Sequence, residues 1–132
     1  MIANIVAVAA GGAVGASLRY LASAGVTRAL AGVAWAAALP VGTLAVNVFG
    51  CLVIGMLSVL LGSLAPARPQ LSLFLVTGVL GGFTTMSSFS NETLTLWQAG
   101  QHMTAFGYVV GTVLVCLSAV AAGHALAQLL LH

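Results

Sequence analysis

Charged side chains are almost absent from this sequence, and their scarcity limits the possible folds more than any other feature. Of 132 residues, three are Lys or Arg and one is Asp or Glu, namely Arg19, Arg28, Arg68 and Glu92. A soluble domain carries roughly a quarter charged residues, whereas 61% of this chain is apolar and its mean hydropathy is +1.20. We therefore expect an integral membrane protein. So few cations make no phosphate-binding surface, and no nucleic-acid partner is expected.

Four long apolar runs follow one another along the chain. A helical span of a bilayer needs about 20 predominantly apolar residues, and the runs cover approximately Ile2–Ala24, Leu39–Leu61, Leu71–Trp97 and Met103–Leu131. They are too long for barrel strands of about 10 residues, and a membrane admits only helices or closed barrels. The sequence predicts a single all-α transmembrane domain over residues 1–132, with four helices and no separate soluble domain.

The third run contains a segment that does not favour a continuous helix. The sequence GVLGGFTTMSSFSNET (78–93) places three glycines before a cluster of hydroxyl side chains. The pair Gly81–Gly82 weakens a continuous helix, whereas a helix broken near Gly81–Thr84 exposes backbone that can coordinate an ion. The alternative is that the glycines serve close packing between helices. The residue pattern alone leaves both interpretations open.

The cations give almost no charge bias between the two sides of the membrane. With four spans, both termini share one side with the loop at Arg68, and the loop at Arg28 lies on the other side, with Arg19 nearer to it. The positive-inside rule needs a clear excess of Lys and Arg on one side. The sequence therefore favours insertion in both orientations, with two opposed copies pairing about a two-fold axis in the membrane plane. The alternative is one topology fixed by other factors.

Three polar residues within the runs are the first candidates for chemistry. An arginine in a membrane helix is costly and is a functional candidate by default, so Arg19 either attracts anions into an aqueous vestibule or packs its stem and reaches the interface. Asn47 either forms a structural hydrogen bond between helices or offers its amide to a passing anion. Glu92 is better explained as a solvated or paired charge than as a proton-coupling group.

Two stripes of polar and sulphur-containing side chains recur at helical spacing, namely Thr43, Asn47, Cys51 and Tyr108, Thr112, Cys116. Such stripes more often serve packing than an ion path. The cysteines suit small buried residues better than a disulfide framework. His102, His124 and His132 lack the spacing of metal ligands, and no catalytic motif is present, so we expect neither such a metal site nor an enzyme.

Three segments together resemble the signatures of a known family. GGAVGASLRY (11–20), GTLAVNVFG (42–50) and GVLGGFTTMSSFSNET (78–93) are similar, in order and spacing, to those of the Fluc/CrcB fluoride channels. The resemblance implies a passive, fluoride-selective channel of the bacterial inner membrane, built as an antiparallel homodimer among lipids, which exports fluoride and relieves its toxicity. It also implies a structural sodium ion at the dimer centre, held by the backbone carbonyls of Gly81 and Thr84 from each subunit.

The same resemblance assigns a fluoride path, in which side chains replace the water held by a small anion. Its members here are Asn47, Met86, Phe89, Thr112, Cys116, Thr43 and Ser88, with Arg19 in an anion vestibule. Two positions depart from the family pattern, because Met86 stands where a first pore phenylalanine is expected and Cys116 replaces a hydroxyl by a weak S–H donor. Either change could lower conduction, alter selectivity or mark a chain that works with a second, different subunit.

Other functional classes fit the composition less well. A small multidrug exporter of dual topology has similar length and hydrophobicity, but proton–drug exchange there needs a carboxylate in the first span, which this chain lacks. A structural or assembly protein would explain the glycines but would leave Asn47 and the polar segment 84–90 without a role. A more specific version of this alternative is a non-conducting paralogue of the channel family.

Overall fold

The spans predicted from hydropathy are present as helices. The computed structural model describes residues 1–62 and 68–131, and within these ranges every regular element is helical. Four segments are long and apolar enough to cross a membrane, namely Ile2–Ala29, Val41–Leu60, Pro69–Gln98 and His102–Leu131. The first span continues to Ala29 instead of ending at Ala24, and the other bounds agree with the prediction within a few residues. His132 lies outside the described residues.

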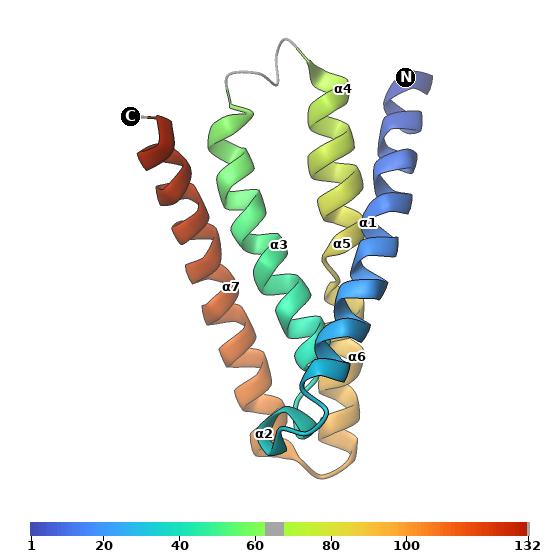
Figure 1. Cartoon of the computed structure of the whole chain (residues 1–132). Helices are drawn as coiled ribbons and strands as arrows, with labels where there is room; N and C mark the ends of the chain where they lie inside the picture. The colour runs from blue at the N-terminus through green and yellow to red at the C-terminus, as the bar shows by residue number, and fades with distance from the viewer. Residues whose placement is uncertain (63–67, 132) are drawn as a thin grey trace.

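The helices form a bundle in which both ends of the chain lie at the same end (Figure 1). This arrangement agrees with an even number of spans. α3 packs mainly on α7, and α1 packs mainly on the third span. The elements in chain order are α1 (Ile2–Ala29), α2 (Ala34–Ala37), α3 (Val41–Leu60), α4 (Pro69–Ser72), the π-helix η1 (Leu73–Leu80), α5 (Gly81–Phe83), α6 (Met86–Gln98) and α7 (His102–Leu131).

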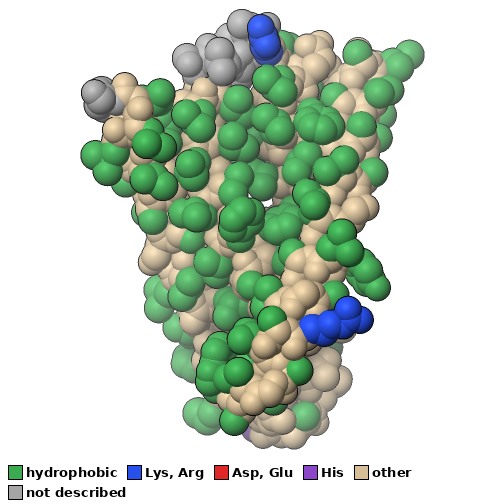
Figure 2. Space-filling view, in the orientation of Figure 1, with side chains coloured by type: hydrophobic (Ala, Val, Ile, Leu, Met, Phe, Trp, Pro, Cys, Tyr) green, Lys and Arg blue, Asp and Glu red, His purple; other side chains and the backbone are tan. Residues whose placement is uncertain are grey.

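The outer surface of the single chain is predominantly apolar. On the face shown in Figure 2, hydrophobic side chains are spread from one end of the bundle to the other, and Lys or Arg atoms are visible in only two places. Large apolar side chains such as Ile5, Leu114 and Leu129 are exposed along the helices. In water each exposed Å² of apolar surface costs about 25 cal/mol, but among lipid tails this cost disappears. The surface therefore suits a bilayer.

Glycines allow α1 and the third span to approach each other closely. Gly11 and Gly15 of α1 are buried against a segment that contains Gly78 and Gly82. A Cβ atom added at Gly15 would overlap the backbone carbonyl of Val79, and one added at Gly82 would lie 2.7 Å from a backbone carbonyl of α1. Small residues at such crossings let backbones pack directly in a membrane. Close packing, one of the two alternatives for the glycine-rich segment, is therefore the role of Gly78 and Gly82.

A second glycine contact joins α3 to α7. A Cβ atom added at Gly55 of α3 would overlap the carbonyl of Val120, and one added at Gly123 of α7 would overlap the carbonyl of Leu52. The contact is reciprocal, because each helix presents its glycine to the backbone of the other. It fixes the register of α3 against α7 and so determines which side chains of the two polar stripes face each other.

Candidate functional site

Two residues between α5 and α6 have extended backbone. Thr84 has φ −76° and ψ 154°, and Thr85 has φ −147° and ψ 109°. Thr85 is the N-cap of α6, since its Oγ1 accepts a hydrogen bond of 3.2 Å from the backbone N–H of Ser88. Threonine is among the residues preferred at this position because its hydroxyl satisfies an N–H group that the helix leaves free. The chain therefore restarts its helix at Met86 with a satisfied first turn.

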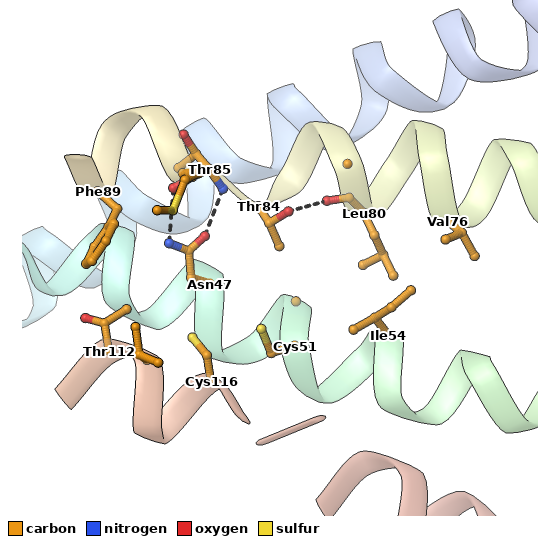
Figure 3. A pocket seen from close by; sticks show the side chains of 14 residues that line it. Asn47, Cys51, Ile54, Val76, Leu80, Thr84, Thr85, Phe89, Thr112 and Cys116 are labelled. Atoms are coloured by element: carbon orange, nitrogen blue, oxygen red, sulfur yellow. Dashed lines mark hydrogen bonds between the residues drawn. The ribbon is translucent and has the colours of Figure 1, made fainter. Parts of the chain in front are cut away.

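The side chain of Asn47 holds this extended segment against α3. Its Oδ1 accepts a hydrogen bond of 2.8 Å from the Thr85 backbone N–H, and its Nδ2 donates one of 3.2 Å to the Thr85 carbonyl (Figure 3). The structural role considered for Asn47 is therefore present. A carboxamide carries two N–H groups, and the second one is not engaged by any other hydrogen bond in the described part of the chain. Asn47 thus retains a donor for a ligand.

The hydrogen bonds of Thr85 remove the helical donors of two backbone carbonyls. In a continuous helix the Gly81 carbonyl would accept from the N–H of Thr85, but that N–H donates to Asn47. The Thr84 carbonyl would likewise accept from the N–H of Ser88, which donates to the Thr85 hydroxyl instead. In addition, Gly81 is exposed, and a Cβ atom added there would have only an ordinary contact, 3.8 Å from the carbonyl oxygen of Val76. Both carbonyls are therefore available to a cation.

A cavity of about 430 Å³ lies between α3, α7 and the third span. Most of the residues proposed from the sequence line it, namely Asn47, Gly81, Thr84, Met86, Phe89, Thr112 and Cys116. Thr112 is 6% exposed, and its hydroxyl has no hydrogen-bond partner among the described residues. Phe89 is also buried and lies against Tyr108, with ring centroids 5.2 Å apart. Met86 lines the cavity but is 72% exposed in the single chain.

The other proposed residues line a second cavity, of about 420 Å³, between α1, α3 and α6. Arg19, Thr43 and Ser88 face this cavity together with Glu92. The Glu92 carboxylate accepts hydrogen bonds from the Thr43 hydroxyl at 2.6 Å and, through its other oxygen, from the Tyr108 hydroxyl at 3.0 Å. Glu92 is therefore a paired group, which is one of the interpretations that the sequence allowed.

Sequence reasoning missed two residues of this region. Thr85 lines both cavities and connects α6 to α3, but the sequence analysis did not single it out within the hydroxyl cluster. The available signal was its place directly before a helix start, where threonine acts as a cap. Tyr108 was assigned to a stripe that more often serves packing, yet its hydroxyl also fixes the Glu92 carboxylate.

Comparison with known proteins places the chain among small membrane proteins. Residues 6–124 match the model of the CrcB-like family, described as "CrcB-like protein, Camphor Resistance (CrcB)". A protein of Paracoccus denitrificans named "Fluoride-specific ion channel FluC" is 46% identical over 116 residues, which cover 88% of this chain and 87% of the relative. Proteins of the same name from Ruminiclostridium cellulolyticum and Agrobacterium fabrum are 42% and 44% identical over 125 residues, covering 95% of this chain and 92% and 96% of the relatives.

Proposed function

The chain belongs to the CrcB-like family of multi-pass membrane ion channels, which are not enzymes, and we propose that it conducts fluoride passively and selectively across the bacterial inner membrane. Net flow follows the fluoride gradient, so the channel exports fluoride and protects the cell when fluoride accumulates inside. The names of the three relatives described above, which are 42–46% identical, support this function.

The observation that carries the proposal is the set of free donors in the first cavity. A buried hydroxyl without a partner, such as that of Thr112, costs roughly 1–3 kcal/mol unless a ligand satisfies it. The remaining N–H of Asn47 and the ring of Phe89 face the same cavity, and an aromatic edge carries partial positive charge. Fluoride is small and strongly hydrated, so a selective path must replace its water with such donors. A larger halide would fit these contacts less well.

We assign the second cavity to the vestibule of the channel. Its cation, Arg19, attracts anions from water into a narrow polar space. The Glu92 carboxylate is held there by hydrogen bonds from two hydroxyl groups, those of Thr43 and Tyr108. Ser88 offers a further hydroxyl on the same wall. Since Thr85 borders both cavities, an anion that enters at Arg19 passes Thr85 before it reaches the first cavity.

We further propose that the extended residues Thr84 and Thr85 form a helix break that holds a sodium ion. Two chains in opposite orientation bring the Gly81 and Thr84 carbonyls of each to a common centre, and their weak Lys and Arg bias permits both orientations. Carbonyl oxygens suit hard cations, and unwound helices supply them in membranes. When bound, sodium links the subunits and makes the nearby potential favourable to anions. The two carbonyls that lack their helical donors support this assignment.

Replacement of sodium tests this assignment. We expect the dimer purified in an N-methyl-D-glucamine buffer to have a lower melting temperature and a larger monomer fraction than the dimer in sodium. The reason is that a bound cation stabilises the folded dimer, and this buffer lacks it. Size-exclusion chromatography and thermal unfolding in detergent measure both quantities. Equal stability and equal dimer fractions in the two buffers would contradict the sodium site and leave the fluoride path untouched.

Fluoride efflux from liposomes tests the main proposal. Proteoliposomes loaded with potassium fluoride are treated with valinomycin, and a fluoride electrode follows the release. We expect rapid loss of fluoride, while liposomes loaded with potassium chloride retain their chloride. Protein-free liposomes provide the baseline.

Absence of efflux from a folded dimer would contradict conduction by the homodimer. It would favour a non-conducting paralogue or an obligate heterodimer. Met86→Phe and Cys116→Ser, alone and together, distinguish these cases. Restored efflux would show that Met86 and Cys116 cause the loss of conduction. Continued absence of efflux would favour a second subunit.

A further inference from the structure

The first cavity contains three sulphur atoms for which a fluoride path has no evident use. They belong to Cys51 of α3, Cys116 of α7 and Met86 of α6. Thiols and thioethers are soft ligands, whereas fluoride is a hard anion that prefers N–H and O–H donors. The sulphur atoms therefore point to a second kind of ligand.

Helix packing brings the two cysteines to one cavity. Both are free and half-buried, and both line the first cavity, Cys51 from α3 and Cys116 from α7. Cys51 lies one helical turn from Gly55, and Cys116 lies two turns from Gly123. These are the glycines that bring the α3 and α7 backbones into contact. Figure 3 shows both cysteine side chains on the wall that α3 and α7 form together.

We propose that Cys51 and Cys116 form a binding site for a thiophilic divalent cation of the Hg²⁺ type, which takes two sulphur ligands in a linear arrangement. The thioether of Met86 borders the same cavity as a weaker, neutral third ligand. The site is a property of this chain, because the glycine contacts already hold the two helices together before a metal arrives.

The charge balance favours a divalent ion. Each thiol binds as a thiolate and releases one proton to water, so two thiolates and one divalent cation form a neutral complex without electron transfer. None of the described residues that line this cavity carries a charge, and a complex with net charge would pay a desolvation penalty there. A tetrahedral ion such as Zn²⁺ normally needs four ligands. No group of three or more His, Cys, Asp or Glu residues suited to a metal occurs in the described ranges, so Zn²⁺ should bind poorly.

Occupation of the site would close the ion path, and this consequence rests on the proposed fluoride function. Asn47, Phe89 and Thr112 line the same cavity as the two thiols. A metal ion between the thiols would take up space that a fluoride ion must cross. Soft heavy metals would then be inhibitors of this channel at low concentration, and removal of the metal by a small dithiol would restore flux.

Metal binding by the purified protein tests the site without any measurement of flux. Isothermal titration with Hg²⁺ should give about one bound ion per chain, with proton release. We expect Cys51→Ser and Cys116→Ser each to weaken binding by more than about a hundredfold, because each removes one of two ligands and even the loss of an outer-shell partner costs roughly tenfold to a hundredfold. Met103→Leu is the matched control, because it removes a sulphur atom that does not line the cavity and should leave the affinity unchanged.

A measurement on the unaltered chain covers the case in which a cysteine variant does not fold. Hg²⁺ should protect both thiols from alkylation by a maleimide, read by mass spectrometry, while Zn²⁺ at the same concentration should not. Equal protection by both ions, or independent labelling of the thiols in the presence of Hg²⁺, would overturn the proposal. Binding of Hg²⁺ by a protein that shows no fluoride efflux would support the metal site and contradict only the channel function.

Discussion

Asn47→Asp is expected to lower fluoride efflux by about a thousandfold in a protein that still folds. A carboxylate about 4 Å from a passing anion repels it by roughly 4 kcal/mol at an effective dielectric constant near 20, and each 1.36 kcal/mol corresponds to about a tenfold change in rate. The substitution keeps the acceptor for the Thr85 N–H but replaces the donor to the Thr85 carbonyl by a second oxygen. Both effects act at the same point of the path, and the liposome assay measures the loss.

Asn91→Asp is the matched control for this substitution. It places the same charge on an exposed position of α6, outside both cavities, and should leave efflux close to that of the unaltered chain. Size-exclusion chromatography of both variants separates loss of conduction from loss of folding. Normal efflux from a folded Asn47→Asp protein would contradict the role of Asn47 in the path.

Gly15→Ala is expected to destabilise the chain by about 1–3 kcal/mol or more, the range for overpacking of a tight interior. An added methyl group there overlaps the Val79 carbonyl. This neighbour belongs to the backbone and cannot move aside by changing a rotamer. The helices α1 and η1 must separate, and the extended segment that follows them loses its support. Thermal unfolding in detergent, followed by circular dichroism, measures the change.

For Gly12→Ala, on the same helix, we expect no loss of stability. An added Cβ at Gly12 meets no atom within 4 Å, and alanine stabilises a helix by up to about 1 kcal/mol relative to glycine. The melting temperature should therefore stay the same or rise. A similar loss of stability in both variants would contradict the contact between α1 and the third span as the reason for Gly15, since helix propensity alone favours alanine at both positions.

The hydropathy pattern was sufficient to predict the helical architecture, because a span needs little more than an apolar run of the right length. The extra residues of α1, as far as Ala29, could not be predicted in this way, since a helix can continue past the apolar region into the interface. The pattern also could not decide what each glycine does. Gly78 and Gly82 face α1 while Gly81 is exposed and has no close contact with α1, and this difference depends on how the third span is rotated against its neighbour.

The partners of the polar residues were harder to predict than their positions. Thr43 and Glu92 are 49 residues apart in the sequence, and nothing local indicates that they meet. Periodicity shows which residues share a face of one helix, but the register between two helices depends on backbone contacts such as those of Gly55 and Gly123. For the same reason the meeting of Cys51 and Cys116 at one cavity was not foreseen, although each was placed on a polar stripe.

The helix break proposed between α5 and α6 would also place two opposite electrical poles inside the membrane. A helix carries roughly half a positive charge at its N-terminus and half a negative charge at its C-terminus. The C-terminal carbonyls before Thr85 therefore favour a cation, while the N-terminal N–H groups of α6, which begins at Met86, favour an anion. An unbroken helix would place both poles at the membrane surfaces, where water and salt screen them. The proposed break would move them to the interior, where one short stretch of chain would favour a cation on one side and an anion on the other.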